Sequence, residues 1–431
     1  MNRPIICTTS SLDLFEGKKI QDSITGSTDI SYRAISNDLD TQIEFSIQNT
    51  GDYIDLSQIY LSLQLQFVKS DGGLFTGEAT EKKFSCINNL SDSLFKQCEV
   101  FLNNTSVSSL DSNYLFKQYI TKILNYGSEP TETFLKTHLF ELDDNDFSAT
   151  LANNGYKSRQ ELIKNSKKVD LFSKLTGGIF NCHNLLLPNV ELRIKFTRTS
   201  DDLVLLAADD VTNVKIKILN ATLYVRHVTV QDEIFLAHSE VLSKHNAEYN
   251  FTQLECRTYT IAPNQDKVSI DNIFLGSTQP KHLIFALVKN SAYSGKKSLN
   301  PFYFQHFDLK NVNLYLNGKI LPSDGLSVSF DDNMVSRAYN QLFSQTPIQN
   351  SNDSHLITLE QFKKGFTIFC YDLSPDRSVG GRHTSLMSEA NIRLELSFKK
   401  SLEDAITVIL LGMFDASIEI NQGREVFLHG F

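Results

Sequence analysis

The order in which segments recur constrains the fold of this chain more than any other feature. Four segments of the first half reappear in the second half in the same order. The pairs are 95–104 with 307–318, 114–124 with 333–343, 189–196 with 391–398, and 221–225 with 416–420. A repeat of this length exceeds a solenoid period and is typical of a duplicated domain. The two copies should therefore superimpose, with Asn103 on Asn317 and Leu192 on Leu394.

Strands are predicted where apolar side chains occupy every second position. This alternation runs through 61–67, 190–196, 214–218 and 392–398. One face of each strand is then apolar and the other polar, as in antiparallel sheets with one side on a core. The dipeptide Asn317-Gly318 predicts a tight hairpin, and Asn103-Asn104 is its counterpart in the first copy. Long crossover helices are missing between these segments, so the pattern favours an all-β fold over a parallel α/β sheet.

The chain length supports two units. It has 431 residues, of which 41% are hydrophobic, so each half can bury a core. A helix is predicted at 114–124, and a second one from Asp232 to about His245, after the closing strand of the first copy. We expect an N-terminal β-sandwich domain at 1–230, a bridging helix and linker at 231–250, and a C-terminal β-sandwich domain at 251–431. Phe235, Leu236 and Leu242 of the bridging helix should pack against both units.

The first copy carries the longer insertions, because the offset between matching segments shrinks along the chain. The largest insertion is expected at about 128–184, which is polar and charged. Long insertions between strands are often interaction surfaces. We therefore expect this segment to project from one end of the first sandwich and to contact another chain or form an exposed tower.

The sequence has no recognisable catalytic signature. It contains no GxGxxG, Walker A loop, HExxH or GxSxG, and it has no His-x-His pair such as cupin enzymes use to bind metals. We therefore expect no catalytic, cofactor-binding or metal-binding residues and no cofactor. His238 and His245 should share one face of the bridging helix, where a structural role outweighs metal binding because a third ligand is not apparent.

Other polar clusters also have simpler explanations than chemistry. The acidic run Asp143–Asp146 lacks the glycine and the terminal glutamate of a calcium loop, so we expect a solvated loop. The basic run Lys164–Lys168 could touch phosphate but is expected to be a solvated loop tip. Gly177-Gly178 and Gly380-Gly381 should be turns. The first of these glycine pairs also resembles a short maturation-protease site, a weak pattern.

Bulk composition excludes several classes of protein. The net charge of −9 argues against a dedicated nucleic-acid binder. The N-terminus lacks the apolar core of a signal peptide, and the longest apolar run, near 405–411, is far shorter than a membrane span needs. Free buried thiols in a reducing compartment are expected, since no CxxC or CxH spacing occurs. The cysteines are Cys7, Cys86, Cys98, Cys182, Cys256 and Cys370.

From about Leu12 to Phe427, the chain resembles the major capsid proteins of Polinton/Maverick elements, adintoviruses and Polinton-like viruses. The stretches that carry the resemblance are 93–103, 114–127, 235–238, 300–304 and 365–376. Each stretch alone is weak, and their joint order is what makes the likeness specific. Within such a family a penton protein would need only one jelly roll, which the length of this chain does not fit.

The resemblance implies a double jelly roll, two eight-stranded sandwiches fused head to tail. It also implies that three chains form a pseudo-hexameric capsomer and that capsomers tile an icosahedral shell. The implied partners are further copies of the chain, a single-jelly-roll penton protein and minor or cement capsid proteins, with packaged DNA touched at most indirectly. The implied location is the virion. From the residues alone, a two-domain lectin-like binding module and a jelly-roll enzyme remain as alternatives, and each would need a binding or metal constellation that the sequence does not display.

Overall fold

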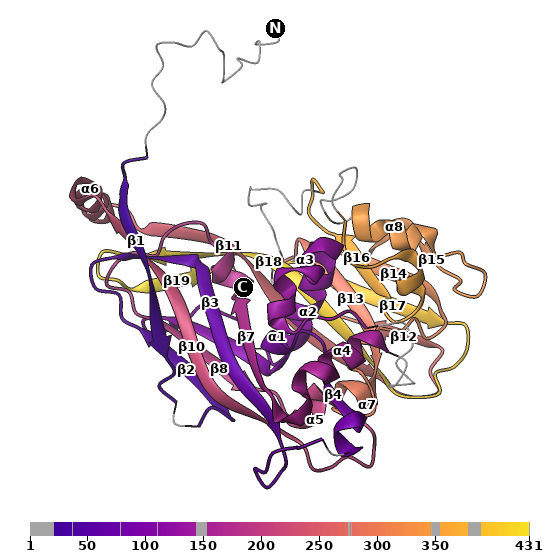
Figure 1. The fold of residues 1–431 in the computed structure, drawn as a ribbon. Helices are drawn as coiled ribbons and strands as arrows, with labels where there is room; N and C mark the ends of the chain where they lie inside the picture. The colour runs from indigo at the N-terminus through magenta and orange to yellow at the C-terminus, as the bar shows by residue number, and fades with distance from the viewer. Residues whose placement is uncertain are drawn as a thin grey trace, which may run out of the picture.

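Four antiparallel sheets form two similar halves in the computed structural model, which describes residues 21–430 apart from 37, 78, 110, 144–152, 275, 277, 345, 347–353 and 378–388. In the first half, one sheet has the order β1 (Ile24–Arg33), β10 (Lys215–Val230), β3 (Tyr53–Val68), β7 (Lys168–Lys174). The other has the order β2 (Gln42–Ile47), β8 (Leu192–Arg198), β5 (Phe95–Leu102), β6 (Thr105–Ser106). The two halves lie side by side in Figure 1, the first in indigo to magenta and the second in orange to yellow.

The second half repeats this arrangement strand for strand. One sheet has the order β11 (Ala247–Ile261), β18 (Ile406–Ile420), β13 (His282–Lys289), β16 (Ile368–Asp372), and β19 (Val426–His429) also pairs with β18. The other has the order β12 (Lys267–Ile270), β17 (Ile392–Phe398), β14 (Leu309–Leu316), β15 (Lys319–Ser327). Since both halves place their first strand beside their last long strand and close with equivalent hairpins, the duplication inferred from the sequence is present in the fold. The prediction of an all-β double jelly roll is confirmed.

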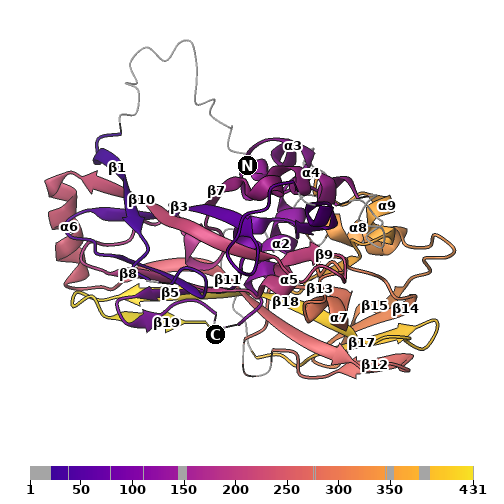
Figure 2. The ribbon, with the colours of Figure 1, turned by 60° about the horizontal axis from the view of Figure 1, so that its bottom comes forward.

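Short helices join and cover the sandwiches. They are α1 (Leu90–Ser93), α2 (Tyr114–Asn125), α3 (Ser128–Glu132), α4 (Asn154–Ile163), α5 (Asp201–Val204), α6 (Asp232–Leu242), α7 (Asn290–Tyr293), α8 (Ser336–Ser344) and α9 (Leu359–Lys363). Single 3₁₀ turns are η1 (Ala79–Lys83), η2 (Phe134–His138), η3 (Lys164–Ser166) and η4 (Gly178–Asn181). A two-stranded sheet pairs β4 (Phe84–Cys86) with β9 (Leu205–Ala207). Viewed in Figure 2, α2 lies between the two sandwiches.

Matching hairpins give the strongest residue-level match between the halves. Asn103, with φ 52°, donates its backbone N–H to the Glu191 carbonyl at 2.8 Å and accepts the Glu191 N–H on its side chain at 2.9 Å. Asn317, with φ 50°, makes the same two bonds to Asn391, both at 2.9 Å. Asparagine tolerates this left-handed backbone, which explains its use at both turns. The correspondence of Asn103 with Asn317 is confirmed.

The expected correspondence of Leu192 with Leu394 is wrong. Leu192 lies opposite Leu102, the residue before the first hairpin asparagine, whereas Ile392 lies opposite Leu316 before the second. Ile392 therefore takes the place of Leu192. A shift of two residues along a strand keeps the same side chains on the same face, so the apolar alternation cannot reveal it.

Aromatic side chains pack in both sandwich interiors. In the first half Phe95 of β5 packs against Phe196 of β8, with ring centroids 4.7 Å apart. In the second half Phe285 and Phe369 stack across β13 and β16 at 4.8 Å. All four side chains are buried, which is the main source of stability expected for such sandwiches.

The bridging helix α6 forms where the sequence predicts it, although it ends at Leu242 and not near His245. Leu242 is buried and Phe235 is partly buried against the core. The expected packing of Leu236 is wrong, because 66% of this residue is exposed. The helix lies beside β1 at the outer edge of the first half (Figure 1), and Leu242 is its one buried residue.

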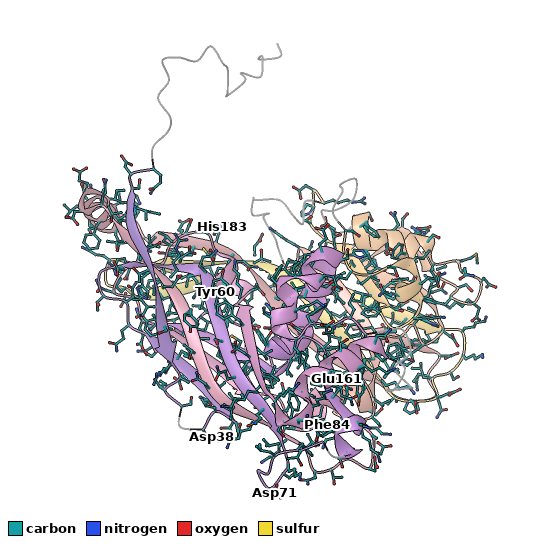
Figure 3. The ribbon with its side chains drawn as sticks, in the orientation of Figure 1. Asp38, Tyr60, Asp71, Phe84, Glu161 and His183 are labelled. Atoms are coloured by element: carbon teal, nitrogen blue, oxygen red, sulfur yellow. The ribbon has the colours of Figure 1, made fainter. Side chains whose placement is uncertain are left out.

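The segment expected as an insertion at about 128–184 contains part of the sandwich itself. Strand β7 pairs with β3 from Tyr60–Lys174 to Gln66–Lys168 and completes the first sheet. The rest of the described segment contributes α3, η2, α4, η3 and η4; η2 and α4 contact β7, η3 and η4 contact β3, and α3 packs on η2. The loop that projects at the lower end of the first half in Figure 3 is the one that carries Asp71.

Candidate assembly surfaces

Polar side chains of the first half cover the free edge of a strand in the second half. Strand β11 ends its sheet, so one row of its backbone groups has no strand partner. Asp111 Oδ2 accepts the Cys256 N–H at 3.0 Å, and Ser109 Oγ donates to the Leu254 carbonyl at 3.2 Å. Lys117 Nζ reaches the same carbonyl at 3.4 Å and pairs with Asp111 at 2.9 Å. These three residues satisfy backbone groups that would otherwise be costly to bury.

Helix α2 lies between the two halves and joins their cores. Its predicted apolar face is buried, and so is the opposite face. Tyr119 stacks on Phe302 with centroids 3.9 Å apart, and Phe116 contacts both Tyr293, at 5.4 Å, and Phe302, at 5.7 Å. The Tyr293 hydroxyl donates to Asn113 Oδ1 at 3.0 Å. Because these contacts remove large aromatic surfaces from water, the interface between the halves is core-like and permanent.

A fully buried ion pair extends this interface. Arg159 of α4 donates to the Asp143 carboxylate at 2.7 Å, and neither side chain is exposed. Arg159 also donates to the carbonyls of Cys86, at 2.9 Å, and Glu141, at 2.7 Å. Asn300 of the second half donates to the other Asp143 oxygen at 3.2 Å. Burial raises the pKa of the Asp143 carboxyl, and the Arg159 guanidinium opposes that rise.

Asp143 was expected in a solvated acidic loop together with Asp144–Asp146. That expectation is wrong for Asp143, whose carboxylate is a buried link between the halves. Asp144, Asn145 and Asp146 lie outside the described residues. Nothing in the local sequence distinguishes Asp143 from its neighbours, since its partner Arg159 follows sixteen positions later within a polar stretch.

The outer surface of the first half presents apolar groups. Every residue of β1 is exposed or nearly so, including Ile24 at 39% and Ile30 at 38%. On the same sheet Phe172 of β7 packs on Tyr60 at 5.3 Å and on Tyr224 of β10 at 5.8 Å. Figure 3 labels Tyr60 on this sheet. Uncovered edge strands and aromatic rows are features that proteins usually cover by association.

The two helical histidines have a structural setting. His238 accepts or donates a hydrogen bond with the Tyr53 hydroxyl at 2.7 Å, and His245 lies past the end of α6. Both line a pocket of about 450 Å³ together with His183, Glu248 and other polar and apolar residues. Among the described residues, no three His, Cys, Asp or Glu side chains gather in a geometry that could hold a metal ion.

The remaining sequence candidates are also accounted for. Lys164 and Lys167 lie in the turn before β7, Lys168 is the exposed first residue of β7, and Lys164 pairs with Glu161. Gly177 and Gly178 form a turn with φ of 89° and 56°, and a side chain at Gly178 would meet Gln253 of the second half at 2.8 Å. Gly380-Gly381 lies outside the described residues.

The described thiols lie in surroundings that disfavour the reactive thiolate form. Burial raises the pKa of Cys86 and of Cys98 to about 12, and it raises the pKa of Cys256 well above its usual value. A thiol with such a pKa carries almost no thiolate near neutral pH, so it is a poor nucleophile. Each described cysteine is free, as expected, and Cys7 lies outside the described residues.

Sequence analysis missed the residues that join the halves. Ser109, Asp111 and Lys117 are scattered polar positions whose common target, the edge of β11, appears only in three dimensions. Phe302 lies within a stretch that supported the family resemblance, but its stacking on Tyr119 could not be inferred from spacing. Among the described helices none reaches the length and apolarity of a bilayer span.

Solved structures with this fold come from viral capsids. The Sputnik virophage cryo-EM structure matches with a TM-score of 0.63 at 14% identity over 99% of this chain and 93% of that chain. The mavirus major capsid protein matches at 0.53 and 10% identity, over 100% of this chain and 95% of that chain. The Faustovirus major capsid protein matches at 0.56 and 8% identity, over 94% of this chain and 92% of that chain. At these identities the likeness concerns the fold.

Two sequence comparisons agree with that fold. An uncharacterised protein of Caenorhabditis elegans, F54H12.2, is 22% identical over 361 residues, which cover 82% of this chain and 84% of that protein. The model of the double jelly roll-like domain family matches residues 176–416. This match covers more than half of the chain and includes strands of both sandwiches, so the chain belongs to the double jelly roll-like domain family.

Proposed function

We propose that this protein is a viral major capsid protein that trimerises into pseudo-hexameric capsomers, which tile an icosahedral shell. The observation that carries the proposal is the repetition of one eight-stranded sandwich in a single chain, with the same strand order in both sheets of each half. Two similar units per chain let three chains present six nearly equal sides, and oligomers are usually closed and symmetric. The matched virophage and mavirus structures support this assignment by fold.

The same proposal includes the division of the chain. The N-terminal jelly roll precedes residue 231, and the bridge expected at 231–250 is shortened to 231–246, because the C-terminal jelly roll begins with β11 at Ala247. The bridging helix is exposed on most of its surface, and β1 beside it is uncovered, so this end of the first jelly roll is available for contacts within a shell.

The proposed partners follow from the same role. Copies of this chain form the trimer and the neighbouring capsomers, a single-jelly-roll penton protein occupies the vertices, and minor or cement proteins bind between capsomers. The protein acts in the virion as a structural component, without an enzymatic activity and without a cofactor. Its net charge of −9 disfavours close contact with DNA, which is touched at most indirectly. The resemblance to Polinton/Maverick and adintovirus capsid proteins supports this role.

Light scattering after size-exclusion chromatography, with negative-stain microscopy of the peak, tests the proposal. We expect a mass of three chains, a hexagonal outline in projection, and no change when EDTA is added. A mass of one or two chains over a wide concentration range would refute the capsid assignment and favour the binding-module alternative. Dissociation of trimers by EDTA would refute the proposed absence of a metal.

A further inference from the structure

Helix α2 holds a buried lysine whose hydrogen bonds are all satisfied inside the first half. Lys122 Nζ donates to the Asp92 carboxylate, to Asn89 Oδ1 at 2.8 Å and to His138 Nδ1 at 2.6 Å. Asn89 Nδ2 also donates to Asp92 Oδ2 at 3.0 Å. These four side chains are all buried and form the Lys122 cluster. The cluster joins α2 to α1, to the residue before α1 and to η2.

The geometry fixes the protonation state of His138. An ammonium group can only donate, so His138 Nδ1 must accept and the imidazole must be neutral. Lys122 and Asp92 balance each other's charge, so the complete cluster carries no net charge. A proton on Nδ1 would replace the acceptor by an N–H directed at the Lys122 ammonium. It would also bury a positive charge without a counter-ion, which is costly in the interior. One added proton is therefore enough to break the cluster.

Other charged groups near His138 do not offset such a proton. Among the elements packed against η2, α1 contributes Asp92, which is already paired with Lys122. Lys136 of η2 is exposed and pairs at the surface with Glu132 at 3.2 Å and Glu141 at 3.6 Å. The remaining charged residues of α3 and β7 are exposed or partly exposed, namely Glu129, Lys168, Asp170 and Lys174. The titratable groups that face Asp92 stay neutral in acid, since burial raises their pKa; they are Tyr114, Tyr126 and Cys98.

Acid should therefore weaken the cluster. Burial first, and then the Lys122 charge, lower the pKa of His138 from 6.5 to about 4, and Asp92 opposes this shift. An opened cluster exposes the imidazole to water and restores its ordinary pKa, so between these two values the open state binds more protons than the closed state. The stabilisation is complete above pH 6.5 and is lost as the pH falls towards 4.

The turn η2 is the part of the cluster that can open. It is a single turn of five residues, Phe134–His138, and Phe134 is 49% exposed. Thr137 Oγ1 holds the turn to β7 by donating to the Phe172 carbonyl at 2.8 Å. Short segments with exposed side chains open locally at a lower free energy than the core strands around them. Water and protons thus reach His138 without unfolding of either sandwich.

The end of α2 that carries Lys122 also meets the second half. The carbonyl of Ile123 accepts the Leu356 N–H at 3.1 Å. Lys122 lines a cavity of about 360 Å³ together with His282 and Met413 of the second half. This end of α2 is therefore fixed on one side by the Lys122 cluster and contacts the second half on the other, so a change at His138 reaches the joint between the halves.

We propose that the Lys122 cluster is an acid-sensitive switch: it holds the end of α2 in place near neutral pH, and protonation of His138 releases that end and loosens the joint between the two halves. The switch is a property of the single chain and does not depend on the proposed function. In a shell built from this chain, acid would loosen each subunit at the joint between its own jelly rolls.

Hydrogen exchange of the full chain at pH 7 and pH 5 tests the switch, with rates corrected for intrinsic exchange at each pH. In the parent, the opening equilibrium of peptides from η2 and the end of α2 should rise about 20-fold, the ratio that follows from pKa values of 6.5 in the open state and about 4 in the closed state. His138→Asn places an amide oxygen near the position of Nδ1, so it keeps an acceptor for Lys122 but cannot be protonated. In this variant the same peptides should change less than about threefold.

His282→Leu is the matched control. Burial lowers the pKa of His282 to about 4 as well, but this histidine lies on β13 and outside the cluster, so the rise expected in the parent should persist. An equal response in the parent and in His138→Asn overturns the inference. So does a parent response below about threefold, a result that needs no variant to fold. Either result leaves the proposed function intact, because that function is tested by the mass of the assembly.

Discussion

Replacement of Arg159 by alanine should destabilise the protein severely, because it leaves the buried Asp143 carboxylate without its cationic partner. The Arg159 side chain is fully buried and donates to Asp143 and to two backbone carbonyls. Asp143 would keep its bond from Asn300 but lose its only cation in the described interior. The change therefore affects the joint between the two halves and not merely α4.

The expected loss can be worked from these contacts. Removal of one partner of a buried ion pair costs about 3–5 kcal/mol, because the other charge stays uncompensated. The carbonyls of Cys86 and Glu141 also lose their donor, and each unsatisfied buried group costs about 1–3 kcal/mol unless water enters the space left by the side chain. We expect a loss of about 5 kcal/mol, a large part of the 5–15 kcal/mol that is typical of folded domains.

Urea unfolding at fixed protein concentration measures this loss, with the double variant Arg159→Met, Asp143→Asn as the comparison. The double variant removes the stranded charge, keeps an acceptor for Asn300 and should recover more than half of the loss. In Arg159→Ala alone, the carboxyl loses the cation that opposed the rise of its pKa, so it binds a proton more readily folded than unfolded. That variant should therefore become more stable relative to the parent as pH falls from 7 towards 5. A loss below about 1 kcal/mol, or an equal loss in single and double variants, would refute the reasoning.

Three further outcomes are expected. Tyr119→Ala removes the ring that stacks on Phe302 at 3.9 Å and should cost about 3–5 kcal/mol in urea unfolding, whereas Tyr259→Ala, at a 41% exposed position, should cost little. Burial lowers the pKa of His282 from 6.5 to about 4, so between these pH values the unfolded chain binds more protons than the folded chain. The melting temperature of the parent should therefore fall as the pH drops from 6.5 to 4. The melting temperature of His282→Leu should fall less steeply over the same range. Leu236→Ser, at a 66% exposed position of α6, should change the free energy of unfolding by less than about 0.5 kcal/mol, and a loss of several kcal/mol would mean that α6 packs against the core after all.

Local patterns in the sequence were enough for the architecture. Alternating apolar residues located β3, β8, β10 and β17, and the asparagine turns located the paired hairpins. The order of the repeated segments predicted the duplication, because equivalent strands need similar apolar patterns to pack similar cores. The register between the repeats could not be predicted, because an apolar pattern with a period of two does not distinguish Ile392 from Leu394 as the counterpart of Leu192.

Long-range partners set the limit of the sequence predictions. Strand β7 was placed in an insertion because its pairing with β3 bridges about a hundred residues that no local pattern connects. Asp143 was assigned to solvent because its partners include Arg159 and Asn300, which lie on other elements of the fold. The contact surface between the halves was missed for the same reason, since the role of Ser109 and Asp111 depends on their hydrogen bonds to the edge of β11.

The position of α2 also sets the order of events during synthesis. Phe116 and Tyr119 are translated long before Phe302, the residue that covers them. Until that part of the second half emerges, a nascent chain carries an aromatic helix face with no cover, and the first sandwich is unfinished even though its own strands are complete. Chaperones that hold apolar segments would find their target on this face. Chains cut short before Phe302 would keep this face exposed and would therefore be prone to aggregate.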